Sequence, residues 1–162
     1  MRKITAIIIH HSLSYWGSAD VIRHWHCDPR PQGNGWKVAG YHFVIQNGYP
    51  IYNSWHNKQY KGSQVEFLVP IEQVSNGCKH ANKNSINVCL IGNFDTESPG
   101  NVQYSEAINL IARLLKKYNL TVADVYGHGE MMKKIGKEGY VKSCPGKLFD
   151  MDHFRRAVKV WM

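Results

Sequence analysis

Two histidines and one cysteine, far apart in the chain, stand where they could bind a metal ion together. His10 ends an apolar run near the start, His128 follows a short apolar stretch late in the chain, and Cys144 precedes a Pro-Gly turn. Imidazole nitrogen and thiolate sulfur are good zinc ligands, and a zinc ion with three protein ligands keeps its fourth position for water. The combination therefore predicts a catalytic zinc site rather than a structural one.

The first candidate ligand belongs to a pair of adjacent histidines, His10 and His11. Side chains alternate along a β-strand, so the two point to opposite faces and only one can enter a given cleft. Alternation alone leaves the choice between them open. Each could instead be a polar residue at a strand end, and His128 could be an ordinary histidine in a turn.

The spacing of the cysteines excludes two kinds of cysteine site. Cys27, Cys78, Cys89 and Cys144 include no C-x-x-C pair, so neither a zinc finger nor a thioredoxin-like motif is indicated. Cys89 lies in an apolar run and is expected to be a buried thiol. Cys144 follows Lys142 by two residues and precedes a turn, so we expect an exposed, electropositive setting that favours its thiolate.

The segments that must position these residues alternate between strands and helices. Strands are predicted at about residues 5–10, 41–45, 86–91 and 124–126, and helices from the N-cap Ser18, over 104–118 and over 151–161. The nearly continuous apolar run at 86–91 is typical of a central strand. Asn47-Gly48 predicts a hairpin in which residues 50–52 return beside the strand at 41–45, followed by a loop over 54–83.

The two later helices carry clear apolar stripes. The inward-facing residues are predicted to be Ala107, Ile108, Ile111, Leu114 and Leu115 in the first helix, and Phe154, Ala157, Val158 and Trp161 in the last. Strands interleaved with helices predict an α/β fold: a single domain over residues 1–162, with a central mixed β-sheet packed by helices. The candidate ligands follow strands, so the active-site cleft is expected at the strand ends.

The formal net charge of +8 favours polyanionic partners such as nucleic acid, an anionic membrane or a bacterial cell-wall polymer. No helix-turn-helix, zinc finger or aromatic RNA platform is visible, so direct nucleic-acid binding is not expected. No apolar stretch is long enough to span a bilayer. The first apolar run is too short for a secretory signal peptide, so accumulation in the cytoplasm is expected.

Six motifs occur together along almost the whole chain. They are IIIHHS at 7–12, GYHFVI at 40–45, HA at 80–81, NSINVCLIGNF at 84–94, GH at 127–128 and KSCPG at 142–146. In this order they resemble the zinc N-acetylmuramoyl-L-alanine amidases of the phage lysozyme type, whose fold is shared by peptidoglycan recognition proteins. No single motif is specific, but the set is.

The resemblance implies a site and resolves the choice within the histidine pair. It implies one zinc ion per chain, held by His10, His128 and Cys144, with Tyr41 and Lys142 as catalytic residues. The tyrosine-and-cysteine combination is that of the phage lysozyme branch.

The resemblance also implies a substrate-binding groove and a reaction. His80 and Asn84 would lie along the groove for the peptide stem, although the segment 82–87 lacks the glycine of the family pattern. The reaction would be hydrolysis of the amide between N-acetylmuramic acid and L-alanine of peptidoglycan, in which zinc activates water and polarises the carbonyl. Lys142 would stabilise the oxyanion, and Tyr41 would help to pass a proton to the leaving amine.

The cellular role implied is that of a phage or prophage endolysin, a monomer that reaches the cell wall after the membrane is breached. A cytosolic enzyme of wall recycling is an alternative. A second alternative is a non-catalytic peptidoglycan-binding module, against which Cys144 and Lys142 argue. A third is a dual-function amidase that also binds and inhibits a phage RNA polymerase.

Overall fold

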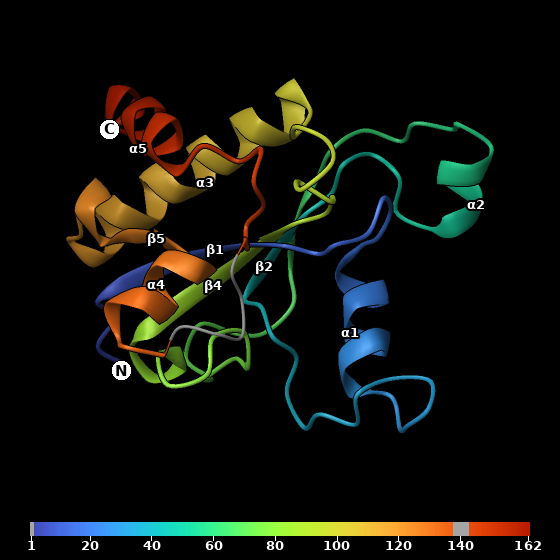
Figure 1. Ribbon diagram of the computed structural model, residues 1–162, viewed down its shortest axis with the longest axis horizontal. Helices are drawn as coiled ribbons and strands as arrows, with labels where there is room; N and C mark the ends of the chain where they lie inside the picture. Colours follow the sequence, from blue (N-terminus) through green and yellow to red (C-terminus); the bar gives the residue numbers. More distant parts are fainter. Residues whose placement is uncertain (1, 138–142) are drawn as a thin grey trace.

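A five-stranded sheet forms the centre of the computed structural model, which describes residues 2–137 and 143–162 (Figure 1). The strands are β1 (Ala6–His11), β2 (Phe43–Ile45), β3 (Val65–Phe67), β4 (Ser85–Leu90) and β5 (Val125–Gly127). They lie in the order β3-β2-β4-β1-β5, with β3 antiparallel to β2 and the other pairings parallel. The predicted α/β fold with a mixed sheet is therefore confirmed, and β4 is the central strand as expected.

Helices cover both faces of this sheet. The α-helices are α1 (Ala19–Cys27), α2 (Tyr52–His56), α3 (Asn101–Tyr118), α4 (His128–Lys134) and α5 (Met151–Trp161), and the 3-10 helices are η1 (Asn82–Asn84) and η2 (Val122–Asp124). Figure 1 shows α3 and α5 next to each other on one side of the sheet. Within residues 2–137 and 143–162, no helix combines the length and apolarity needed to cross a membrane.

The sheet face under α3 and α5 is an apolar core. It is formed by alternate residues of β1 and β4, including Ile7, Ile9, Ile86, Val88 and Leu90, all of which are fully buried. The predicted stripe of α3 is buried in full against them. Burial of this much apolar surface is the main source of folding free energy, so this face holds the sheet rigid.

The stripe predicted for α5 is confirmed except at its end. Phe154 and Val158 are buried, whereas Trp161 is 63% exposed. Trp161 stands on the last turn of α5, where it lines a cavity together with Ala112 and Arg113 of α3. The prediction that Trp161 faces inward is therefore wrong.

The opposite face of the sheet is divided. One small apolar cluster joins α1 to Val44 of β2, and another joins Met131 and Met132 of α4 to Ile8 of β1. The central strand β4 lies between β2 and β1, and it presents Asn87 to this face. This divided face is the one that carries the candidate site.

The segment after β2 departs from the sequence-based prediction. Gly48 does turn the chain, with a φ of +95°, but β2 pairs with β3 and not with residues 50–52, so the predicted hairpin is wrong. The Ser54 hydroxyl accepts from the Ile51 backbone N–H and donates to the Ile51 carbonyl, which winds the chain into α2 instead. The predicted loop over 54–83 also contains β3 and the start of η1.

Candidate metal centre

His10 lies near the carboxyl end of β1, opposite Cys89 of β4 in the sheet register. Its side chain is 1% exposed, and its Nδ1 is 3.9 Å from Cys144 Sγ. His11 points to the other face, where its Nδ1 accepts a hydrogen bond of 3.1 Å from the Phe94 backbone. The structure thus places His10, and not His11, beside the other candidate ligands.

His128 is the first residue of α4, directly after β5, and not a residue of an isolated turn. The glycines on either side bring the Cys144 loop close to it. A Cβ atom on Gly127 would lie 2.7 Å from Pro145 Cδ, so only glycine leaves room for this approach. The Gly129 N–H then donates to the Cys144 carbonyl at 2.8 Å, which fixes the loop against the helix start.

The loop that carries Cys144 is also fixed from the far side by Asp95. One carboxylate oxygen accepts from the Ser143 hydroxyl at 3.1 Å, and the other accepts from the Lys147 backbone N–H at 3.0 Å. The Lys147 hydrogen bond is the main reason that the pKa of Asp95 is lowered. Asp95 therefore brackets Cys144 with one hydrogen bond on each side of it.

The three candidate ligands converge. One ligand atom each from His10, His128 and Cys144 lies within 4.8 Å of the other two, and the two imidazole rings have centroids 4.7 Å apart. Ligand atoms around one tetrahedral zinc ion lie roughly 3.5 Å apart, so small side-chain rotations bring these atoms to a shared ion. Two imidazoles and a thiol are a donor set that suits zinc.

The two histidines are held in the uncharged form that binds metal. Burial, with a contribution from nearby His128, lowers the pKa of His10 well below its usual 6.5. Burial lowers the pKa of His128 to about 4. Near neutral pH both rings are therefore neutral, and each has a nitrogen lone pair to offer a cation.

Cys144 differs from its sequence-based expectation. Its side chain is 9% exposed, and burial raises its pKa to about 12, so the expected exposed thiolate is wrong. A thiol in this environment keeps its proton until a cation replaces it. Metal binding at this site must therefore release a proton from Cys144.

Tyr41 lies next to the cluster, just before β2. Its ring centroid is 5.0 Å from that of His10. Cys89, in the neighbouring strand β4, is buried as predicted. Burial raises the pKa of Tyr41 well above 10, with the Cys89 and Cys144 thiols adding to the effect. The phenol therefore stays protonated and can donate a hydrogen bond into the site.

Two of the other predicted site residues, His80 and Asn84, are not brought into the ligand cluster. Lys142 lies outside the described residues. His80 is exposed in the loop before η1, with a φ of +71°. Asn84 ends η1, and its amide donates to the Lys3 carbonyl at 2.8 Å, at the start of β4 rather than near its carboxyl end. The roles of these three residues stay predictions.

The sequence analysis did not identify two residues that hold the histidines of the candidate site in place, one for His10 and one for His128. For His10 it is Asn87, whose amide oxygen lies 2.8 Å from the His10 Nε2. A lone amide within the apolar run of β4 was the available signal. For His128 it is Glu130, which accepts from the Gly127 N–H at 2.8 Å and so anchors the start of α4.

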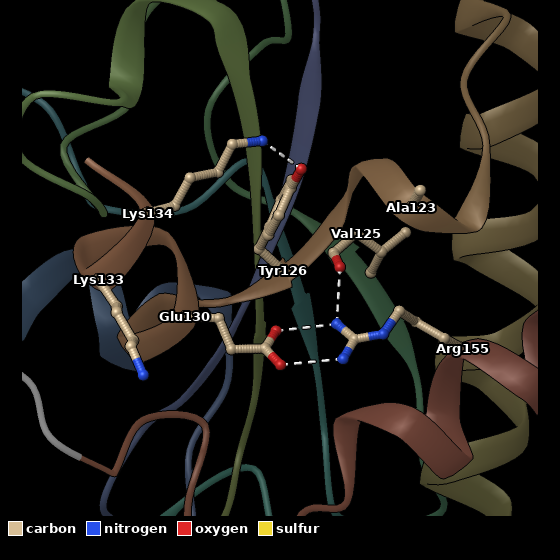
Figure 2. Close-up of a pocket in the computed structure, with 7 residues that line it drawn as sticks. All are labelled: Ala123, Val125, Tyr126, Glu130, Lys133, Lys134 and Arg155. Atoms are coloured by element: carbon tan, nitrogen blue, oxygen red, sulfur yellow. Dashed lines mark hydrogen bonds and ion pairs between the residues drawn. The ribbon is translucent and has the colours of Figure 1, made fainter. Parts of the chain in front are cut away.

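Glu130 is held in turn by Arg155 of α5 (Figure 2). The guanidinium donates to both carboxylate oxygens, at 2.8 and 2.9 Å, and to the Val125 carbonyl at 2.9 Å. Burial pushes the pKa of Glu130 upward, but the hydrogen bonds from Arg155 and Gly127 outweigh it and lower that pKa. No local pattern indicates this pair, because its members lie 25 residues apart on different helices.

This ion pair lines a cavity of about 500 Å³. In Figure 2 the ammonium group of Lys133, another lining residue, points away from the ion pair. None of the three candidate ligands lines that cavity. A smaller cavity of about 280 Å³ is lined by Ser143 and Cys144. The larger cavity is therefore not the place where the metal centre would act.

Comparison with known protein families shows which family the chain belongs to. The chain matches the family model of N-acetylmuramoyl-L-alanine amidase, amidase type 2, over residues 1–147. This chain belongs to the N-acetylmuramoyl-L-alanine amidase family. The family predicted from the sequence motifs, and the prediction of an enzyme of this amidase class, are thereby confirmed. No match is found among the curated proteins.

Solved structures similar to this family member include endolysins. N-acetylmuramoyl-L-alanine amidase LysC from Clostridium intestinale is 22% identical, with a TM-score of 0.74 over 98% of this chain and 87% of that one. The Ph2119 endolysin from Thermus scotoductus bacteriophage Ph2119 is 19% identical, with a TM-score of 0.68 over 98% and 86%. AmpDh3 from Pseudomonas aeruginosa, in complex with anhydromuramic pentapeptide, is 17% identical, with a TM-score of 0.66 over 97% and 61%.

Proposed function

We propose that this protein hydrolyses the amide bond between N-acetylmuramic acid and L-alanine of peptidoglycan, using one zinc ion held by His10, His128 and Cys144. The observation that carries the proposal is the convergence of these three side chains, from three distant segments, to within 4.8 Å in a member of an amidase family. A bound zinc ion supplies Lewis acidity and lowers the pKa of a coordinated water molecule toward ~7.

The neighbouring residues have roles that follow from their protonation states. His10 and His128 are neutral, so each offers a lone pair rather than a proton. Tyr41 keeps its proton and lies against the His10 ring, which supports a role in donating a hydrogen bond to the developing oxyanion or to the leaving nitrogen. Lys142 stands two residues before Cys144 and would supply a positive charge near the same oxygen.

The proposed substrate is a polyanionic polymer, to which a chain of net charge +8 is attracted over long range. Among the structural neighbours, AmpDh3 is complexed with anhydromuramic pentapeptide, a fragment of this chemistry. Recognition of the peptide stem by His80 and Asn84 belongs to this proposal and rests on the sequence motif alone. Action as an endolysin on the cell wall fits the same set of relatives.

The test is digestion of purified sacculi by the intact protein, followed by mass spectrometry of the soluble products. The expected products are peptides with a free L-alanine amino terminus and glycan strands that have lost them. Removal of metal with a chelator should stop the release, and stoichiometric zinc should restore it. New reducing ends without free L-alanine would show cleavage of the glycan instead and would contradict the proposal.

The same digestion separates the amidase from a binding module, because a module would sediment with sacculi and release nothing. Binding to a phage RNA polymerase stays a prediction from the family resemblance. A pull-down with purified polymerase and a run-off transcription assay would test it. A monomeric state is likewise a prediction, which sedimentation analysis would check.

A further inference from the structure

Buried polar groups form a chain of hydrogen bonds that begins at His10. These hydrogen bonds indicate how the His10 ring is oriented. Asn87 is fully buried, and its amide oxygen lies 2.8 Å from the His10 Nε2. The amide nitrogen of Asn87 donates to the Ser75 hydroxyl at 2.9 Å and to the Asn82 side-chain oxygen at 3.2 Å. Every hydrogen-bonding atom of this amide therefore has a partner.

The hydrogen bonds fix which way round the Asn87 amide stands. The Cys78 backbone N–H can only donate, and it does so to the Asn82 side chain at 2.7 Å, so that atom of Asn82 must be an oxygen. The Asn87 atom facing this oxygen must then be the amide nitrogen. The Asn87 atom facing His10 is consequently the oxygen, which can only accept.

This orientation decides the tautomer of His10. An acceptor at 2.8 Å requires a proton on Nε2. A neutral imidazole carries one proton, so Nδ1 is left with a free lone pair, and Nδ1 is the nitrogen that lies 3.9 Å from Cys144 Sγ. The nitrogen that faces the other ligands is thus the one that is free to bind a cation.

The Asn87 side-chain amide packs against the backbone of Gly77, where the absence of a side chain leaves room for it. A Cβ atom on Gly77 would lie 2.9 Å from Asn87 Cγ and 3.0 Å from its Oδ1, so any other residue would push the amide from its place. Asn87 is also held from behind, because its own backbone N–H donates to His42 Nδ1 at 3.0 Å. The amide is therefore fixed on several sides rather than filling a gap in the core.

We propose that Asn87 is the positioning residue of the metal centre: it fixes His10 as the Nε2–H tautomer and aims its Nδ1 at the zinc ion. The inference rests on the proposed zinc site but is separate from the reaction. A hydrogen-bond acceptor behind a metal-binding histidine orients the ring and raises its basicity, and losing such a partner typically weakens metal binding about 10- to 100-fold.

The test uses the full chain in three forms: the native protein, Asn87→Leu, which keeps the volume but removes the acceptor, and Asn87→Asp, which restores an acceptor. Long-range proton–nitrogen correlation spectra of the zinc-free protein read the tautomer of His10. Competition with a chromophoric chelator reads the zinc affinity. We expect Nε2–H in the native protein and in Asn87→Asp. For Asn87→Leu we expect loss of this preference and about 10- to 100-fold weaker zinc binding.

Ser85→Ala is the matched control, because Ser85 is a buried polar residue on the same face of β4 whose hydroxyl donates to the Ala81 carbonyl at 2.9 Å, away from His10. It should bind zinc like the native protein. Circular dichroism shows whether each variant folds. If Asn87→Leu does not fold, the tautomer of His10 in the native protein still decides.

Two results would overturn the inference: a proton on Nδ1 of His10 in the native zinc-free protein, or native zinc affinity in folded Asn87→Leu. Each of these results can occur in a protein that still cleaves sacculi. The proposed role of Asn87 can therefore be wrong while the proposed amidase activity is correct. Conversely, tight zinc binding that depends on Asn87, without release of peptides from sacculi, would remove the proposed reaction and leave Asn87 as the positioning residue.

Discussion

The two faces of the central sheet are built from the same strands but are held together differently. The face under α3 and α5 is one continuous apolar core, with Phe154 completely buried at its centre. The other face is split into two small apolar clusters, one under α1 and one under α4, and Asn87 and His42 occupy the sheet there. The first face supplies stability, and the second supplies oriented polar groups.

The difference shows how a small enzyme can contain buried polar groups and still be stable. A buried amide or imidazole stabilises little in net terms, and it is destabilising whenever one partner is missing. Here the partners are complete around Asn87, and the apolar face holds the shared strands rigid. We therefore expect changes on the two faces to separate stability from metal binding.

The largest effect is expected from Cys144→Ala, on the divided face. Loss of a direct ligand should weaken zinc binding by more than the roughly hundredfold limit typical of an indirect partner, and release of peptides from sacculi should stop. Metal analysis after dialysis measures the first and mass spectrometry the second. Cys78→Ala is the control, since Cys78 is a buried thiol outside the ligand set and its loss should leave zinc stoichiometry unchanged.

Phe154→Ala, on the apolar face, should have the opposite pattern. Emptying this fully buried position is expected to reduce the free energy of unfolding by about 3–5 kcal/mol. Zinc affinity of the folded protein at low temperature should stay within about twofold of the native value, because Phe154 packs in the apolar core and is not one of the three candidate ligands. Val160→Ala, in the same helix but 86% exposed, is the control for urea unfolding. Zinc affinity that fell along with stability would mean that the faces are coupled.

A smaller effect is expected from mild acid, again on the divided face. Burial lowers the pKa of His26 and of His42 to about 4, against about 6.5 in the unfolded chain. The unfolded state takes up protons first as the pH falls below 6.5, so the zinc-free protein should lose stability progressively down to about pH 4. Above pH 6.5 this contribution is complete.

Urea unfolding of the zinc-free protein at pH 7 and pH 5.5 measures this loss above the range in which carboxylates titrate. Replacing one of the two histidines by His26→Gln should reduce the difference between the two values. An unfolding free energy that does not change between pH 7 and pH 5.5 would show that these histidines are not held neutral by the fold.

The long elements of the fold were predictable, whereas the short elements α2, α4 and β3 were not. β4 and α3 have sequence patterns that extend over six and eighteen residues, so the apolar signal is strong. α2 and α4 have only five and seven residues, and their formation depends on hydrogen bonds of Ser54 and Glu130 that a hydrophobic pattern does not contain.

The candidate site divides in the same way. The types and order of His10, His128 and Cys144 were visible in the sequence, because their chemistry depends on residue type. The burial of Cys144 and the partner of His10 were not, because they depend on contacts between segments distant in the chain. Asn87 lies 77 residues from the histidine that it contacts, so only the folded register brings the two together.

The contact between Arg155 and Glu130 sets a limit on where this enzyme can be divided. The family match ends at residue 147, yet Arg155 from α5 anchors the carboxylate that holds the start of the His128 helix. A shortened protein cut at the family boundary would keep all three candidate zinc ligands but leave one of them on a helix that has lost its contact with Arg155. A cell-wall-targeting module should therefore be fused after Met162, beyond the last turn of α5, where the side chains are already exposed to solvent.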